Sequence, residues 1–174
     1  GQVREAACNR VASTGQAAAM PKPIFVLNGP NLNLVGVREP AIYGAETLAD
    51  IRRRTEECGR KLGLAVDFRQ SNAEGELINW IQEAREQADG IVLNAGGYTH
   101  TSVAILDALN AAARPVIELH LSNVFRREPF RHTSYVTPAA QGLICGFGPK
   151  GYELAIEAMA DLLAKTATGA GAKS

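Results

Sequence analysis

Short apolar segments alternate with amphipathic segments along most of the chain, and this alternation limits the possible folds more than any other feature of the sequence. The apolar segments are rich in Ile, Val, Leu and Phe, a composition typical of strands that are buried on both faces. Strands that alternate with helices form a parallel sheet with helices on both sides. We predict five such strands, at residues 24–27, 64–69, 90–94, 116–119 and 142–147.

Apolar side chains at intervals of three and four predict the connecting helices. The first helix, at residues 46–62, has Leu48, Ile51, Thr55, Cys58 and Leu62 on one face. Residues 71–74 match a capping box and predict the start of the second helix. The third helix, at 101–113, is expected to turn Val103, Ala104 and Leu106 inward, and the last is expected to end near residue 164. The predicted architecture is α/β, a flavodoxin-like doubly wound sheet with its groove beyond the carboxyl ends of the strands.

Length and composition fit a single domain. The chain has 174 residues, of which 46% are hydrophobic, which is enough for a proper core. We assign residues 23–165 to one domain and 166–174, rich in Gly and Ala, to a flexible tail. Residues 1–22 are interpreted as a leader or appended extension without fixed structure. They do not fit a signal peptide, because charged residues interrupt what would be its apolar centre.

The charge balance and the cysteines narrow the choice of partner and compartment. Lys plus Arg and Asp plus Glu each number 18, so the formal net charge is zero, which argues against nucleic acid or an anionic membrane as the main partner. The run at residues 52–54, three arginines, is interpreted as the solvated face of the first helix. Cys8, Cys58 and Cys145 are widely spaced and odd in number, which favours a reducing cytoplasm without a disulfide framework or a metal cluster.

Polar residues cluster where three of the predicted strands end. Asn28 and Asn31 follow the first strand, residues 94–100 follow the third, and residues 120–122 follow the fourth. The carboxyl ends of parallel strands lie on one edge of the sheet. We therefore expect these three segments to meet in one groove.

Two histidines in these segments are candidates for chemistry. Glu118, His120 and Ser122 are spaced by two residues and would share one face of an extended chain. A buried Glu beside a His fixes the tautomer of the imidazole. On the residues alone, His100 and His120 fit a structural role and a catalytic role equally well.

The long segment at residues 28–46 carries a tyrosine and an arginine that suit proton transfer. A loop of this length in a compact domain is unusual unless it binds a ligand or acts as a lid, although a merely solvated connection is the alternative. A tyrosine acts as a base only when its pKa falls well below about 10, and a nearby guanidinium favours the phenolate. Arg38 precedes Tyr43 by five residues, and His120 is the best candidate for the general acid opposite it.

The sequence lacks the common cofactor and metal motifs. It contains no Walker A loop, no GxGxxG, no zinc-type spacing of Cys or His, and no GxSxG. Arg127 and Arg131 lie four residues apart and could grip a carboxylate from one helical turn. We therefore predict acid–base chemistry without a metal or cofactor. The alternatives are a non-catalytic flavodoxin-like module that binds a small ligand or flavin, and a structural protein whose assembly is its function.

Five segments, at residues 27–44, 70–84, 93–109, 115–135 and 142–159, match a known family in order and spacing. They include LNGPNLNLVGVREPAIYG and LNAGGYTHTSVAILDAL, and they resemble the type II 3-dehydroquinate dehydratases. The resemblance covers residues 23–164 and implies a flavodoxin-like fold. It also implies a hydro-lyase of the shikimate pathway to aromatic amino acids, which converts 3-dehydroquinate reversibly to 3-dehydroshikimate by anti elimination through an enolate.

The resemblance implies catalytic roles for five residues of this sequence. Tyr43 would remove the proton next to the ketone, and Arg38 would lower the pKa of Tyr43. Asn31 would stabilise the enolate through a bound water. His120 would protonate the departing hydroxyl while Glu118 orients its ring.

The resemblance also implies a set of binding residues and an assembly. The residues implied to bind the hydroxyls and carboxylate of the substrate are Asn94, His100, Asp107, Leu121, Ser122, Arg127 and Arg131. Of these, Leu121 would act through its backbone and Arg127 would support the site. Asp107 would reach the site of a neighbouring subunit, in a dodecamer built from trimers. No metal, cofactor, nucleic acid or membrane is implied. Positions that depart from the common family pattern, and that bear on substrate affinity, are Ala73, Phe125, Arg126 and Pro129.

Overall fold

The structure is a computed structural model that describes residues 20–37, 40–43 and 45–169, with residues 42 and 43 described by their backbone alone. Residues 1–19 of the predicted leader and 170–174 of the predicted tail lie outside the described residues. The last helix continues to Ala167 and so includes the first two residues of the predicted tail. None of the helices in the described ranges is long and apolar enough to cross a membrane.

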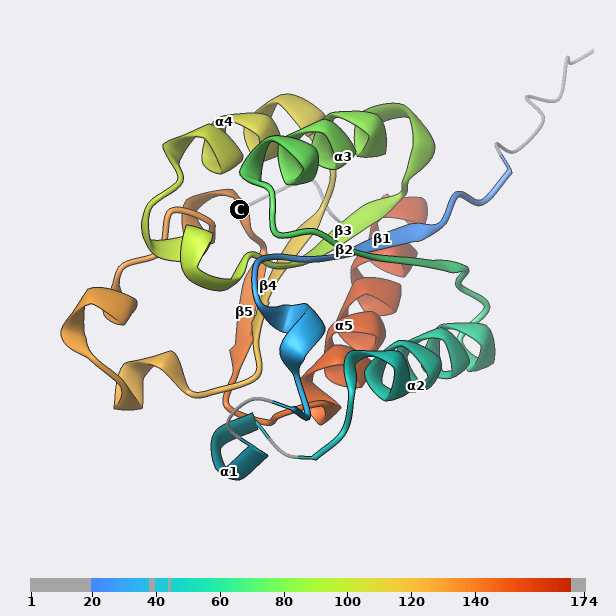
Figure 1. The fold of residues 1–174 in the computed structure, drawn as a ribbon. Coiled ribbons are helices and arrows are strands. Elements are labelled where there is room, and N and C mark those ends of the chain that lie inside the picture. Colours follow the sequence, from blue (N-terminus) through green and yellow to red (C-terminus); the bar gives the residue numbers. More distant parts are fainter. Residues whose placement is uncertain (1–19, 38–39, 44, 170–174) are drawn as a thin grey trace, which may run out of the picture.

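A five-stranded parallel sheet with the order β2-β1-β3-β4-β5 forms the centre of the molecule. This order is the predicted flavodoxin-like one. Figure 1 shows α3 and α4 on one face of the sheet and α2 and α5 on the other. The strands are β1 Ile24–Asn28, β2 Val66–Gln70, β3 Gly90–Asn94, β4 Val116–His120 and β5 Gly142–Cys145. The α-helices are α1 Pro40–Tyr43, α2 Leu48–Lys61, α3 Glu74–Gln87, α4 Val103–Ala112 and α5 Lys150–Ala167.

The core consists of two apolar layers, one on each face of the sheet. Along β1, Phe25 and Leu27 pack into the layer under α3 and α4, whereas Ile24 and Val26 pack into the layer over α2 and α5. Every residue of β1, β3 and β4 is buried. The three central strands are thus covered on both faces, as their continuous apolar sequences predict.

Helix starts differ from the predicted ones in a way that local hydrogen bonds explain. The capping box predicted at residues 71–74 is absent, because the Ser71 hydroxyl accepts from the Ala73 amide and α3 begins without a side-chain cap. A capping box instead starts α2, where Thr47 and Asp50 bond each other's backbone amides.

The inward face of α4 is also not the predicted one. Val103 and Ala104 are exposed, and the buried face is formed by Ile105, Ala108, Leu109 and Ala112. These four positions are spaced by three and four residues, which is the period of a helical face. The prediction was wrong for Val103 and Ala104, whereas Leu106 is half-buried. Val103 and Leu106 also lie three residues apart, so spacing alone does not select the buried face of this helix.

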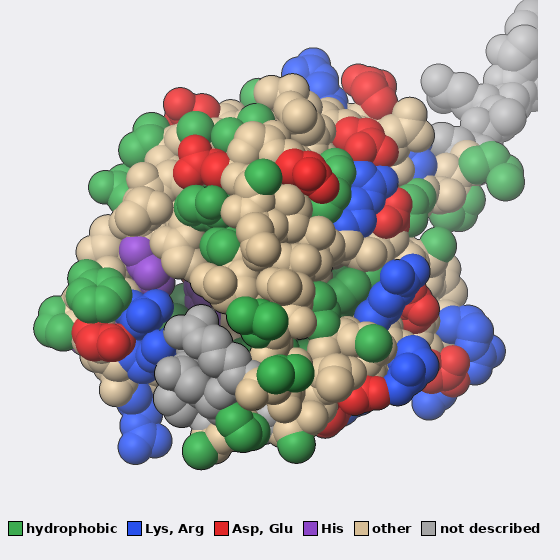
Figure 2. Space-filling model, viewed as in Figure 1, with side chains coloured by type: hydrophobic (Ala, Val, Ile, Leu, Met, Phe, Trp, Pro, Cys, Tyr) green, Lys and Arg blue, Asp and Glu red, His purple; other side chains and the backbone are tan. Residues whose placement is uncertain are grey.

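Two of the three arginines predicted to form a solvated face of α2, Arg52 and Arg53, are exposed. Arg54 is half-buried and pairs with Glu153 of α5 at 2.7 Å, so the prediction was wrong for this residue. Arg52 pairs with Glu56 at 2.6 Å and Arg60 pairs with Glu57 at 2.6 Å. Figure 2 shows basic and acidic side chains intermingled over the corner where Figure 1 places α2. This corner is therefore a mixed surface of ion pairs rather than a basic patch.

The connections at the carboxyl edge of the sheet contain short 3-10 helices. The segment after β1, predicted to be irregular up to Glu46, contains η1 and the single turn α1. The connection between β4 and β5 contains three such turns and no α-helix. The 3-10 helices are η1 Leu32–Leu34, η2 Gly96–His100, η3 Val124–Arg126, η4 Pro129–His132 and η5 Thr137–Ala139.

The turns that leave β1 and β3 touch each other. The Gly29 amide donates to the Asn94 carbonyl at 2.8 Å. A β-carbon on Gly29 would lie 2.4 Å from the carbonyl oxygen of Ala95, which is a backbone atom and cannot move aside freely. Only a glycine lets the two turns approach this closely.

We expect Gly29→Ala to lower the free energy of unfolding by about 3 kcal/mol, the upper end of the usual cost of overpacking, because the clash is with backbone. Gly75→Ala is the matched control, since a β-carbon there meets no described atom within 4 Å. It lies in the first turn of α3 and should raise stability by up to about 1 kcal/mol. Urea-induced unfolding of both variants measures the difference. Equal stability of the two variants would contradict the close contact.

Candidate active site

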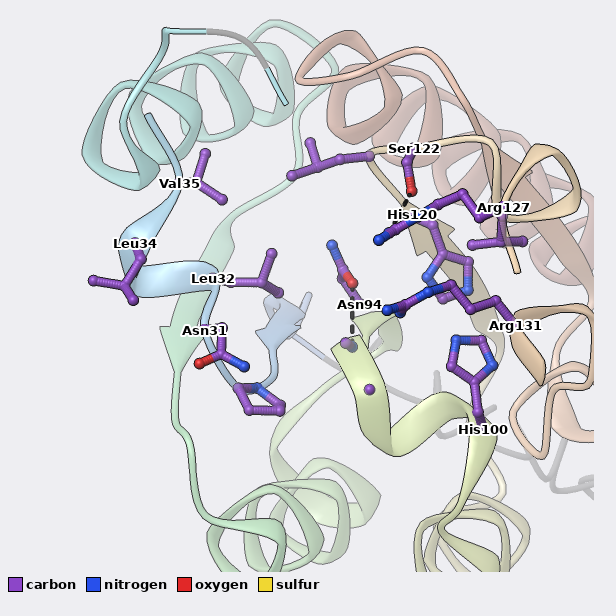
Figure 3. A pocket seen from close by; sticks show the side chains of 15 residues that line it. Asn31, Leu32, Leu34, Val35, Asn94, His100, His120, Ser122, Arg127 and Arg131 are labelled. Carbon is purple, nitrogen blue, oxygen red and sulfur yellow. Dashed lines mark hydrogen bonds between the residues drawn. The ribbon is translucent and has the colours of Figure 1, made fainter. Parts of the chain in front are cut away.

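A pocket of about 230 Å³ lies at the carboxyl ends of the central strands. This is the place predicted for the groove of a doubly wound sheet. Figure 3 shows η1 on one side of it, Asn94 at its base and the histidines and arginines on the other side. The pocket brings together eight of the residues predicted for the site, namely Asn31, Asn94, His100, His120, Leu121, Ser122, Arg127 and Arg131.

One wall of the pocket is formed by η1 and the residue before it. Asn31 has a left-handed backbone with φ of 69°, which Asn tolerates better than most side chains. Its amide donates to Oδ1 of Asn72 at 3.0 Å. Leu32, Leu34 and Val35 supply apolar surface to the same wall. This wall offers one polar side chain in an apolar surrounding.

The base of the pocket is formed by the end of β3 and the turn after it. Oδ1 of Asn94 accepts from the Gly96 amide at 3.3 Å, and Nδ2 of Asn94 donates to the Tyr152 hydroxyl at 3.1 Å. A β-carbon on Gly97 would meet no described atom within 4 Å. A ligand can therefore approach the backbone of this turn closely.

His120 lies against a buried carboxylate. Glu118 is 1% exposed and His120 is 6% exposed, and Nε2 of His120 lies 3.4 Å from Oε2 of Glu118. Their contact confirms that the two side chains share one face of β4. Ser122 lies beyond the end of the strand, where its hydroxyl accepts from Arg127.

Two hydroxyls also hold the carboxylate of Glu118. Ser134 and Thr137 both donate to its carboxylate, Thr137 at 2.9 Å from Oε1. Burial raises the pKa of Glu118, but the hydrogen bonds from His120, Ser134 and Thr137 together outweigh burial and hold this pKa below its ordinary value. A buried negative charge therefore stands directly behind the imidazole of His120.

His100 is fixed from behind and faces the same pocket. Its Nδ1 lies 2.7 Å from the Thr133 carbonyl oxygen. A carbonyl only accepts, so Nδ1 carries the proton and Nε2 of the neutral ring is an acceptor. The ring lies nearly parallel to that of His120, with centroids 6.5 Å apart. The two imidazoles thus occupy one side of the pocket (Figure 3).

The two arginines reach the pocket in a different way from the predicted one. Arg127 follows η3 and Arg131 lies in η4, so they do not share one helical turn. Glu128 contacts both, with Nε of Arg131 at 2.7 Å and Nε of Arg127 at 3.8 Å. Arg127 also donates to the Ser122 hydroxyl at 3.3 Å. Together they give this wall two guanidinium groups, which suit a carboxylate.

Three predicted residues are placed elsewhere or not described. Asp107 lies on the exposed face of α4 and does not line the pocket. Arg38 lies outside the described residues, and Tyr43 ends α1 with only its backbone described. Within the described ranges, no group of three or more His, Cys, Asp or Glu side chains could hold a metal ion.

Sequence reasoning missed three residues that support the site. Tyr152, Ser134 and Thr137 contact Asn94 or Glu118 from behind. A signal for Tyr152 exists, because it lies on the stripe of α5 that also carries the buried residues Ala155, Ile156 and Met159, and a buried tyrosine hydroxyl needs a partner. No sequence spacing links Ser134 or Thr137 to Glu118.

Comparisons with known proteins agree on one family. The family described as dehydroquinase class II matches residues 22–160. The 3-dehydroquinate dehydratase of Rhizobium johnstonii is 57% identical over 145 residues, which cover 83% of this chain and 100% of that protein. The 3-dehydroquinate dehydratase of Phenylobacterium zucineum is 61% identical over 143 residues, which cover 82% of this chain and 99% of that protein.

Solved structures show the same relationship. The type II dehydroquinase from Butyrivibrio crossotus superposes with a TM-score of 0.78 at 45% identity, covering 80% of this chain and 97% of that one. The type II dehydroquinase from Propionibacterium acnes has a TM-score of 0.78 at 46% identity, covering 82% and 98%. The strand order, the position of the pocket and these matches lead to one assignment: the chain belongs to the class II dehydroquinase family.

Proposed function

We propose that this protein is a hydro-lyase that converts 3-dehydroquinate reversibly to 3-dehydroshikimate in the shikimate pathway. The observation that carries the proposal is the His120–Glu118 pair, which faces a pocket with two guanidinium groups in a chain of the class II dehydroquinase family. The pair suits the protonation of a leaving hydroxyl. The guanidinium groups suit the carboxylate of the substrate.

The pocket has suitable partners for a small hydroxylated ring acid. Arg131, with Arg127 in support, would bind the carboxylate. Asn94, His100 and Ser122 would bind hydroxyls, and the backbone of Leu121 would complete the contacts. A pocket of about 230 Å³ has room for a single six-membered ring.

The elimination would begin on the side of the pocket formed by the segment after β1. Tyr43, with its pKa lowered by Arg38, would take the proton from the carbon next to the ketone. The electron pair left behind would form an enolate, which Asn31 would stabilise through a water. Asn31 lies in the pocket wall and Tyr43 in α1 of the same β1–α2 connection, which supports a common site for the two.

The second step would take place on the opposite side. The enolate would collapse to a conjugated enone as the carbon–oxygen bond of the leaving hydroxyl breaks, and His120 would give that hydroxyl a proton to form water. Glu118 stabilises the protonated ring and holds its orientation. Tyr43 then carries a proton and His120 lacks one, so a transfer through solvent would restore both.

Absorbance measurements test the reaction directly, because the product is a conjugated enone and the substrate is not. We expect the ultraviolet absorbance to rise after 3-dehydroquinate is added to the protein. Borohydride treatment in the presence of substrate should leave the rate unchanged, since an enolate route forms no Schiff base. A flat absorbance with folded protein would overturn the proposed function.

His120→Asn should lower kcat by about 10²- to 10⁴-fold, the contribution of a positioned general acid. His132→Asn is the matched control, because the His132 ring contacts the Arg127 carbonyl and does not line the pocket. We expect it to leave kcat essentially unchanged. Steady-state kinetics of the two variants decide the role, and equal kcat values would exclude His120 as the acid.

Glu118→Gln tests the buried charge through stability. The folded pKa of Glu118 is lowered, so its carboxylate stabilises the fold above the ordinary pKa of about 4.3, and this contribution is lost as pH falls through the folded pKa. The variant should be less stable at neutral pH by roughly 1 to 3 kcal/mol, and its stability should fall less steeply below about pH 5. Unfolding free energies measured from pH 3 to 8 check this. Parallel curves for both proteins would show that the carboxylate is not stabilised.

We further propose that the protein acts in the cytoplasm as a dodecamer built from trimers, in which Asp107 reaches the site of a neighbouring subunit. Asp107 is exposed on α4, close to Val103, which is 51% exposed. An exposed carboxylate on an outer helix is accessible to a neighbouring subunit. Both cysteines in the described ranges, Cys58 and Cys145, are free, which fits a reducing compartment.

Asp107→Asn should raise KM while the assembly stays intact, because the variant loses a contact with substrate across the interface. Analytical ultracentrifugation of the wild-type protein and the variant measures the assembly, and kinetics measure KM. A wild-type protein that sediments as a monomer with full activity would contradict the shared site.

A further inference from the structure

A chain of buried hydrogen bonds leads from the base of the pocket into the core. It joins Asn94 at the end of β3, Tyr152 in α5 and Asn28 at the end of β1, which are 3%, 1% and 0% exposed. Nδ2 of Asn94 lies 3.1 Å from the Tyr152 hydroxyl, and that hydroxyl lies 2.6 Å from Oδ1 of Asn28. The roles described above for the pocket residues do not say what Tyr152 and Asn28 contribute to the reaction.

The direction of each hydrogen bond is fixed from the inner end. Nδ2 of Asn28 donates to the Arg69 carbonyl at 2.9 Å. Turning this amide round would place two acceptors together, so Oδ1 of Asn28 must face Tyr152. The phenol has one hydrogen and donates it to Asn28. Its oxygen is therefore the acceptor that Asn94 meets.

This direction determines the orientation of the Asn94 amide. With Nδ2 bound to the Tyr152 oxygen, Oδ1 accepts from the Gly96 amide at 3.3 Å. The opposite orientation would place the NH₂ group against the Gly96 N–H and the oxygen against a hydroxyl whose hydrogen is already used. An asparagine amide has two hydrogens and two oxygen lone pairs. One hydrogen and one lone pair of Asn94 thus remain for a ligand in the pocket.

The Tyr152 hydroxyl keeps its proton throughout. Burial raises the pKa of Tyr152 above its ordinary value. The phenol is therefore a neutral donor and acceptor under working conditions, without a part in proton transfer. Its contribution is geometric.

We propose that Tyr152 is a positioning residue that, with Asn28, sets which atoms of the Asn94 amide face the substrate. The inference rests on the proposed function, in which Asn94 binds a hydroxyl of 3-dehydroquinate. It extends the site from the pocket wall to α5, 58 positions away from Asn94 in the sequence. The substrate meets one amide orientation instead of two.

A double-mutant cycle tests whether Tyr152 acts through Asn94. Tyr152→Phe should lower kcat/KM by about tenfold, the effect of one misdirected hydrogen bond. In the Asn94→Ala background the same change should have little further effect on kcat/KM, because the group that it positions is gone. The free energy of unfolding should fall in both backgrounds. An equal fold-loss of kcat/KM in both would show a merely structural role and overturn the inference.

Two further variants keep the test decisive. Asn28 does not line the pocket. Asn28→Ala removes the acceptor that directs the phenol of Tyr152. It should reproduce the loss of kcat/KM, and it replaces Tyr152→Phe in the test if that variant does not fold. Thr55→Val is the matched control, because it removes a buried hydroxyl that donates to the Ile51 carbonyl at 2.7 Å, away from the site. It should lower stability and leave kcat/KM unchanged. A similar loss of kcat/KM in Thr55→Val would overturn the inference.

The wild-type protein separates this inference from the proposed function. If it dehydrates 3-dehydroquinate while the cycle is additive, only the positioning role of Tyr152 falls. If it neither turns over nor binds 3-dehydroquinate, the proposed function falls and the positioning role falls with it.

Discussion

The parallel pairing of β1 with β3 is the interaction on which the rest of the structure depends. The register pairs Asn28 with Asn94, so both strands end in an amide at the same level of the sheet. The turns after them are in contact through Gly29 and Ala95. A doubly wound sheet reverses its winding between these two strands, and the crevice at that point is where such folds bind ligands. The pocket, its base and the η1 wall all follow from this one pairing.

The site holds a buried carboxylate beneath a wall that carries two arginines and their own acidic partner. Glu118 lies below the pocket surface and is held by two hydroxyls, whereas Arg127 and Arg131 lie in the wall with Glu128 beside them. The imidazole of His120 stands between the two regions. A buried carboxylate acts over a short distance with little screening. Its charge therefore acts mainly on the ring that covers it.

The sequence predicted the parts of the structure that depend on periodicity. The five strands, their order and the polar residues at their ends follow from short apolar runs that alternate with helices. Positions that depend on contacts between distant segments were not predictable in this way. The hydroxyls of Ser134 and Thr137 reach Glu118 through turns with no periodic pattern, and Thr47 rather than Ser71 caps a helix because of local hydrogen bonds. Family resemblance, rather than periodicity, indicated Asp107 and the catalytic role of Asn31.

The left-handed backbone of Asn31 has a consequence for the entropy of binding. Its amide is held by Asn72, whose side chain also accepts from Gln70 and whose carbonyl accepts from the Tyr98 hydroxyl. An ordinary residue adopts this left-handed conformation at a cost of about 1 kcal/mol or more. Because Asn72 holds the Asn31 amide, the conformation is ordered during folding and not during binding. A ligand that enters the pocket meets a wall whose backbone is already fixed, so little of its binding energy is spent on ordering that wall.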